Sequence, residues 1–282
     1  MTVAEFQLIV VIALILVPLE RLLPLHRGNK TLRDGLPVDL LHVFVSGLII
    51  RAGTLVTALV LAAVCARLIP GSVQQAVRGQ PGWLQVVELL LVSDLCFYLA
   101  HRLCHSVPWL WRFHEVHHSS EQMDWLATFR VHPVDQIVNS TIIMVPGLVL
   151  GFSPLAFVIY ATVYRVHAIL LHSNVRVALG PLDLVIASPR YHHWHHANEP
   201  DAYDKNFGGQ LVIWDYLFRT VHNPATLPAQ YGVCNEVPKT YAQQLLAPFR
   251  RQRPRRSAAG TTFVAGPADV HAVPCVDGAA NP

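Results

Sequence analysis

The chain has 282 residues, of which 52% are hydrophobic and only 14% are charged, and its formal net charge is +3. Soluble proteins carry roughly 25% charged residues, so this composition argues against a soluble globular domain, and it argues equally against a disordered chain, which needs low hydrophobicity and high charge. The mild positive charge does not require a nucleic-acid partner, because a basic membrane-facing surface explains it as well. We therefore expect an integral membrane protein.

The N-terminal part of the chain contains two long apolar stretches. Residues 4–19 form the first predicted spanning helix, which we interpret as retained rather than as a signal peptide because no small-x-small cleavage site follows it. Residues 40–69 form the second. At 1.5 Å per residue, this second stretch is long enough to cross about 30 Å of hydrocarbon.

A third helix is predicted to begin near Trp83 and to run through His101 to His105, and Pro108 ends it. Loop residues 20–37 hold four Lys/Arg, whereas the loop after the second helix holds about two. The positive-inside bias therefore places the first loop in the cytoplasm. The second helix then leaves the cytoplasmic side and the third returns to it, so His101 and everything after it is expected to face the cytoplasm.

Residues 136–164 contain no Asp, Glu, Lys, Arg or His in 29 positions. Proline and glycine clusters at residues 145–147 and 151–154 interrupt this stretch, and such clusters break helices. We therefore predict two short helices that form a membrane hairpin over residues 136–172. The hairpin returns the chain to the side from which it left.

These elements predict an all-α integral membrane bundle of about four spanning or hairpin helices with a cytoplasmic helical cap, and the histidine pattern described below assigns a dimetal site to that cap. Residues 1–82 would contain the N-terminal transmembrane helices and loops. Residues 83–225 would form the histidine-rich catalytic domain. Residues 226–282 would form a cytoplasmic segment that contains an arginine run at 250–256 and ends in a flexible tail.

Histidine is the unusual residue of this chain, since there are 16 histidines and 12 of them lie between His101 and His196. His101 and His105 have the i,i+4 spacing that places two side chains on one helix face. Residues 114–118 and 192–196 each follow the pattern HxxHH, which aims three imidazoles at one point. A structural zinc takes four ligands, so eight histidines in three clusters indicate two metal ions with open coordination positions. Imidazole suits iron, copper, nickel and zinc.

The order HxxxH, HxxHH, HxxHH resembles the fatty acid hydroxylase/sterol desaturase superfamily of membrane di-iron oxygenases, and the likeness covers roughly residues 85–222. Sequence around the boxes is similar as well. The flanking matches are Asp94 to Arg102, His117 to Ser120, Phe129 to Pro133, Leu171 to Asn174, Asn206 to Gly208, and Trp214 with Asp215. The resemblance implies metal-ligand roles for nine residues. They are His101, His105, His114, His117, His118, His172, His192, His195 and His196.

The second ring nitrogen of a ligating histidine needs a hydrogen-bond partner that holds its tautomer. Asp94 lies seven residues before His101, about two helical turns, and is therefore a candidate for this role. Asn174 is a second candidate. His193 falls at the variable position of the last box and is not assigned as a ligand.

The resemblance implies oxidation of an unactivated C–H bond with O₂ as co-substrate, either hydroxylation or desaturation of a fatty acyl, sterol or related lipid. The implied cofactor is a pair of iron ions, which zinc could replace in a purified form. A lipid from the bilayer would be the substrate. A separate electron donor, a ferredoxin or a cytochrome with its reductase, would be the protein partner.

Two other functions remain open from the residues alone. His114-Glu115-Val116-His117-His118 also matches HExxH, the zinc-binding pattern in which Glu115 would be the general base of an intramembrane metalloprotease. That interpretation leaves His101, His105 and the last box unexplained. A metal transporter is the other alternative, although transporters place their ligands near the membrane midplane, whereas these clusters begin at helix ends.

Overall fold

The computed structural model describes residues 3–234 and 237–250. Within these ranges the chain is helical and forms no β-strand, which confirms the predicted all-α class. Three isolated backbone bridges join distant segments instead, and one of them pairs Pro24 with Val175. Most of the predicted arginine run and the predicted flexible tail lie outside the described residues.

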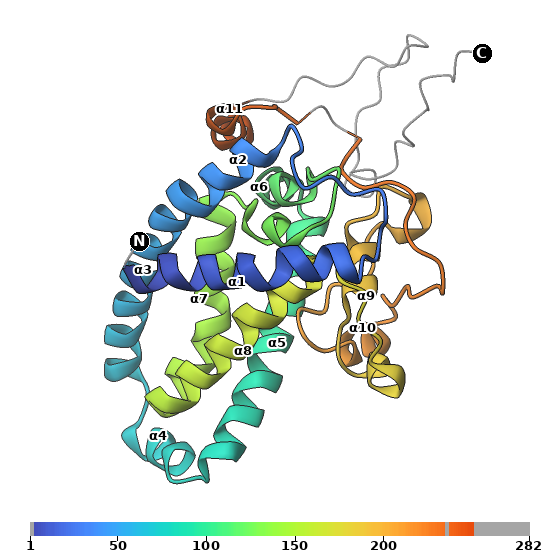
Figure 1. Ribbon diagram of the computed structural model, residues 1–282. Helices are drawn as coiled ribbons and strands as arrows, with labels where there is room; N and C mark the ends of the chain where they lie inside the picture. Colours follow the sequence, from blue (N-terminus) through green and yellow to red (C-terminus); the bar gives the residue numbers. More distant parts are fainter. Residues whose placement is uncertain (1–2, 235–236, 251–282) are drawn as a thin grey trace, which may run out of the picture.

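The helices follow the chain in the order drawn in Figure 1. Those before the histidine boxes are α1 (Val3–Leu22), α2 (Leu36–Leu41), the π-helical turn η1 (His42–Ser46), α3 (Gly47–Leu68) and α4 (Gly71–Arg78). The central ones are α5 (Gly82–Ser106), α6 (Pro108–His118), η2 (Trp125–Phe129), α7 (Pro133–Leu150) and α8 (Pro154–His172). The last are η3 (Gly180–Leu184), α9 (Pro189–His195), η4 (Pro200–Ala202), α10 (Ile213–Phe218), α11 (Tyr241–Leu246) and η5 (Ala247–Phe249).

Within the described residues, four helices are long and apolar enough to cross a membrane, which agrees with a bundle of about four spanning or hairpin helices. They are Leu36–Leu68, Gly82–Ser106, Pro133–Leu150 and Pro154–His172. The span through α3 carries outward-facing leucines such as Leu55 and Leu59, which are 58% and 62% exposed. Apolar side chains so exposed are stable when they face lipid rather than water. In this bundle α7 packs against both α3 and α5, and α8 packs against α5.

The predicted hairpin exists, but one of its two predicted breaks is wrong. Gly151 ends α7 in the left-handed conformation at φ 78°, as proposed for the 151–154 cluster. Residues 145–147 do not break the helix, because α7 continues through Pro146. Membrane helices tolerate an internal proline when neighbouring groups satisfy the freed backbone. Gly147 serves packing instead, since a Cβ atom there would overlap the ring of Phe157 on α8.

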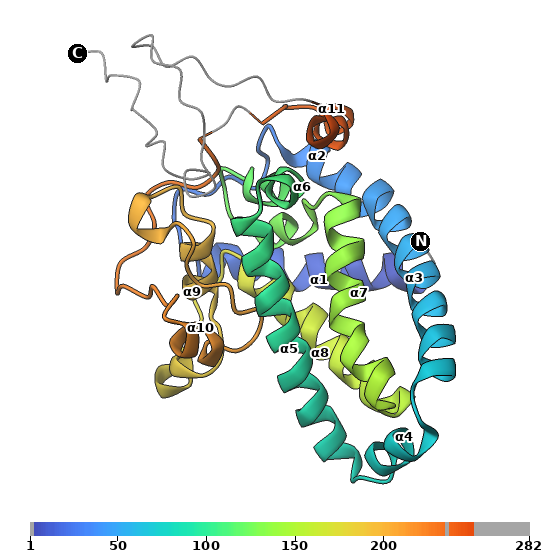
Figure 2. The ribbon, with the colours of Figure 1, turned by 180° about the vertical axis from the view of Figure 1, so that it is seen from behind.

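The first helix does not stand beside the four spans. In both views α1 runs across α7 and α8 rather than alongside them (Figures 1 and 2). Leu16 of α1 packs in a core cluster with Val43, Ile169 and Val175. The span predicted for residues 4–19 stays a prediction.

Candidate metal centre

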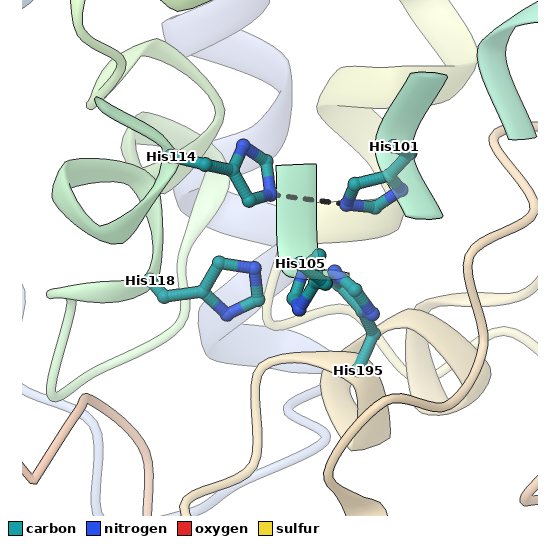
Figure 3. A group of neighbouring side chains, drawn as sticks. All are labelled: His101, His105, His114, His118 and His195. Carbon is teal, nitrogen blue, oxygen red and sulfur yellow. Dashed lines mark hydrogen bonds between the residues drawn. The ribbon is translucent and has the colours of Figure 1, made fainter. Parts of the chain in front are cut away.

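Ring nitrogens of nine buried histidines gather into two groups at one end of the bundle. The five-histidine group consists of His101, His105, His114, His118 and His195, and its ligand atoms lie within 4.8 Å of one another. Figure 3 shows these five rings turned toward a common centre. The four-histidine group consists of His117, His172, His192 and His196, with the same limit on its distances. The structure thus brings together all nine histidines that the sequence singled out.

Each group draws on several helices. The end of α5 supplies His101 and His105, one turn apart, because the i,i+4 spacing places them on one face. The end of α8 supplies His172, and the remaining ligands come from the short helices α6 and α9 with its C-cap His196. The short helices α6 and α9 therefore bring their histidines to the ends of the spanning helices α5 and α8.

The sequence analysis expected each HxxHH box to aim its three imidazoles at one point. The structure instead divides each box between the two groups. In α6, His114 and His118 enter the five-histidine group, whereas His117 enters the four-histidine group. The last box divides in the opposite sense, since His195 joins the first group and the other two histidines join the second. A 3.6-residue helical period places positions i and i+4 on nearly one face and position i+3 to the side, so one turn can supply ligands to two neighbouring ions.

Distances between the rings have the scale of metal coordination. The Nε2 atoms of His101 and His114 are 3.1 Å apart. In the other group, the Nε2 atom of His172 lies 3.1 Å from that of His117 and 3.0 Å from that of His192. Two imidazole nitrogens bound at right angles to one ion at about 2.1 Å are separated by about 3.0 Å. The rings are therefore spaced as cis ligands of a single ion would be.

Backbone carbonyls hold several of the opposite ring nitrogens. The Nδ1 atom of His101 donates to the carbonyl oxygen of Phe207 at 2.9 Å, and that of His195 donates to Lys205 at 2.8 Å. His172 Nδ1 donates to the carbonyl of Ala168 at 2.8 Å. A carbonyl oxygen only accepts, so these rings carry their proton on Nδ1 and direct the Nε2 lone pair into the group.

Some inward-facing nitrogens have no protein partner. The Nε2 atoms of His118 and His195 are buried and make no hydrogen bond within the described residues. Burial lowers the pKa of His117 and His195 to about 3, with neighbouring histidines adding to the effect. These rings are therefore neutral near pH 7, and a neutral imidazole is the form that binds a metal ion. A buried lone pair without a donor is costly in a metal-free protein, so the donor set fits a metal centre.

Asp135 is a functional residue that the sequence analysis missed. Its Oδ2 atom lies 3.1 Å from Nδ1 of His114, and its Oδ1 atom accepts from Asn139 at 3.0 Å. This is a carboxylate–histidine arrangement that orients a ligand. The signal was available, because Asp135 lies two residues after Pro133, in the first turn of the helix that the sequence analysis began at residue 136.

The two residues proposed for this orienting role have other partners. The carboxylate of Asp94 accepts from the backbone N–H of Gln210 and Leu211 at 2.8 and 3.0 Å, and also from the indole of Trp214. Asn174 bonds the backbone of His26 through both its amide atoms. Among the described residues, neither makes a hydrogen bond to a ligand histidine. Both hold neighbouring backbone segments instead, and Asp94 also holds the Trp214 side chain.

A buried ion-pair network lies behind the four-histidine group. Arg130 donates to Asp39 at 2.5 Å, and Arg33 bridges Asp39 and Asp124. The carbonyl of Arg130 lies 3.2 Å from Nδ1 of His117. Since buried charges persist only when they are paired, this network holds the backbone that orients one ring of the group.

His193 lies outside both groups, in agreement with its exclusion from the ligand set. It is fully buried, and its Nε2 atom donates to the carbonyls of His172 and Ser173 at 3.3 and 3.1 Å. It therefore ties α9 to the end of α8. This contact positions the two helices that supply the four-histidine group.

The fold and the site together define a multi-pass membrane protein with two buried histidine groups that could hold metal ions. Residues 86–220 match the model of the fatty acid hydroxylase family, and these residues contain all nine clustered histidines. The region that holds the histidine groups therefore belongs to the fatty acid hydroxylase family. No solved structure matches the chain.

Several curated relatives are similar to this region. An ornithine lipid hydroxylase of Rhizobium tropici (OlsE) is 36% identical over 173 residues, which are 61% of this chain and 52% of the relative. Alkylglycerol monooxygenase of Danio rerio is 36% identical over 151 residues, covering 51% of this chain and 32% of that protein. The human alkylglycerol monooxygenase is 37% identical over 134 residues, covering 45% and 28%. The chain thus spans about half the length, or less, of these relatives.

Proposed function

We propose that this protein is a membrane-bound non-haem di-iron oxygenase that hydroxylates a C–H bond of a lipid, using O₂ and electrons from a separate donor. The observation that carries the proposal is the pair of buried histidine groups at the ends of the spanning helices. Family membership and the names of the relatives, a lipid hydroxylase and monooxygenases, support the same reaction class.

Iron is the proposed metal because the reaction needs an ion that changes oxidation state and binds O₂, and zinc has no redox chemistry. Neutral imidazoles suit iron, and each group offers four or five of them. The proposed ligands are His101, His105, His114, His118 and His195 for one ion, and His117, His172, His192 and His196 for the other. When bound, the ions would supply the activation of O₂ for C–H cleavage.

The protein's own residues would orient the ligands and keep water out. Carbonyls and Asp135 hold the rings in one tautomer, and the nine rings are all more than 90% buried. A lipid chain could reach the centre sideways from the bilayer, because His101, His105 and His172 lie on the spanning helices themselves. Each methylene buried on binding would contribute about 0.8 kcal/mol.

The metalloprotease alternative fits this geometry poorly. His114 and His118 of the HExxH pattern both enter the five-histidine group, whereas a catalytic zinc site has three protein ligands and an open position. Hydroxylation is favoured over desaturation by the names of the relatives, which are hydroxylases and monooxygenases.

The test is lipid profiling of oxygenated cells with and without the protein, together with the variant His195→Ala/His196→Ala. We expect one lipid class to gain the mass of one oxygen with the wild type and not with this variant, because each group loses one ligand. His222→Ala, a histidine outside both groups, is the matched control and should retain the product. The purified wild type should contain close to two equivalents of iron. An unchanged lipid profile with well-expressed wild-type protein would contradict the proposal.

A further inference from the structure

A pocket of about 320 Å³ opens where α1 ends, away from the histidine groups. It is lined by Arg21, Leu22, Leu23, Pro24, Arg27 and Arg176. Three of the six residues are arginines, from two segments that lie about 150 positions apart in the sequence. The pocket therefore concentrates positive charge that the metal centre does not use.

The backbone of this pocket is held by a pairing between distant segments. The N–H of Arg176 donates to the carbonyl of Leu23 at 2.7 Å, and the N–H of Leu25 donates to that of Asn174 at 2.9 Å. The side chain of Asn174 adds two bonds to the backbone of His26. Arg176 is thereby fixed beside the end of α1, so the convergence of the three arginines is built into the fold.

The three arginines lack a protein counter-charge. Arg21, Arg27 and Arg176 are all exposed, and none forms an ion pair with a carboxylate of the described residues, unlike Arg33 and Arg130 in the buried network. Like charges gathered in one pocket repel one another. An anion bound among them would remove that repulsion.

The nearest acidic residue in the sequence is turned away from the pocket. The Oε1 atom of Glu20 accepts from the backbone N–H groups of Trp125 and Asn174 at 2.8 and 2.9 Å. Burial raises the pKa of Glu20 to about 7, so this carboxyl is only partly ionised at neutral pH. Glu20 is thus engaged with backbone N–H groups and forms no ion pair with Arg21, its neighbour in the chain, among the described residues.

Apolar side chains form the rest of the pocket and place it at a membrane surface. Leu22 and Leu23 are 75% and 52% exposed, and the span through α8 ends at His172, four residues before Arg176. Leucines that face hydrocarbon beside guanidinium groups that face phosphate are expected at the level of lipid headgroups. The planar guanidinium fork also matches phosphate oxygens in a bidentate manner.

We propose that this tri-arginine pocket binds a phosphate-class anion, presented by the headgroup of an anionic membrane phospholipid. The segment that carries Arg176 leads directly to His172, a proposed metal ligand, and four residues of chain span at most about 14 Å. A bound headgroup would therefore steady the segment that enters the four-histidine group. The binding itself does not depend on the proposed oxygenase reaction.

The experiment is native mass spectrometry of the full-length protein released from nanodiscs of phosphatidylcholine with added phosphatidylglycerol. We expect the wild type to retain phosphatidylglycerol in preference to phosphatidylcholine. The double variant Arg27→Gln/Arg176→Gln should retain about tenfold less phosphatidylglycerol, because two charged hydrogen-bonding groups are lost. Arg67→Gln/Arg78→Gln removes the same charge at the other end of the bundle and should bind as the wild type does.

A competition with inorganic phosphate distinguishes the two sources of the anion. If phosphate displaces the lipid only at concentrations far above that of the lipid, the headgroup assignment is supported. Strong binding of inorganic phosphate without retention of phosphatidylglycerol would overturn it. Equal retention of phosphatidylglycerol by the two double variants would show that the tri-arginine pocket is not the binding site. Because no turnover is measured, neither result bears on the proposed oxygenase reaction.

Discussion

Individual residues of the metal centre differ in what they do for it. The nine clustered histidines direct nitrogen atoms inward, whereas the residues behind them decide which nitrogen carries the proton. Carbonyl oxygens perform this task for His101, His172 and His195. The carboxylate of Asp135 performs it for His114, which makes Asp135 the side chain whose loss should affect the metal without removing a ligand.

We expect Asp135→Asn to lower metal affinity by about 10- to 100-fold, the usual cost of losing a group that orients a ligand. An asparagine amide can donate to Nδ1 of His114 and thereby favour the tautomer that turns the protonated Nε2 inward. The measurement is iron content after dialysis against a chelator, with Asp201→Asn, on the exposed cap, as the control. Equal retention of iron by both variants would show that Asp135 has no orienting role.

At the scale of elements, the short membrane hairpin depends on close approach of its two helices. Gly147 of α7 faces the ring of Phe157 on α8, and any Cβ atom there would overlap that ring. The hairpin delivers His172 to the metal centre through the end of α8, so its packing and the position of a ligand are linked.

Gly147→Ala should destabilise the protein by about 1–3 kcal/mol, as overpacking usually does. Thermal unfolding in detergent measures the effect. Gly82→Ala is the matched control, because nothing lies within 4 Å of a Cβ atom at that position. If the two variants unfold at the same temperature, the close contact between α7 and α8 does not contribute to stability.

For the molecule as a whole, the chain crosses between two ends of one bundle. The loop helix α4 lies at one end and α6 near the other, whereas the histidine-bearing helix α9 lies beside the bundle, and the two views agree on this (Figures 1 and 2). The distribution of Lys and Arg favours a cytoplasmic cap. The proposed electron donor would have to reach the cap, which is consistent with that orientation.

Cysteine labelling in intact cells tests this orientation. We expect Ser72→Cys on α4 to react with a membrane-impermeant maleimide from outside, and Asp201→Cys on the cap to react only after lysis, because both positions are exposed but at opposite ends. The unmodified protein gives the background from its native thiols. The reverse labelling pattern would place the metal centre on the outer side.

The sequence by itself determined the membrane class, the hairpin and eight of the nine clustered histidines, because these depend on hydrophobic run length and on short-range spacing along single helices. The ninth, His172, followed only from the family resemblance. It did not determine how each HxxHH box divides between two groups, the role of Asp135, or the pairing that brings Arg176 to Arg21 and Arg27. Those features need contacts between residues far apart in the chain. Only the tertiary structure decides them, since it sets which face of each helix meets which neighbour.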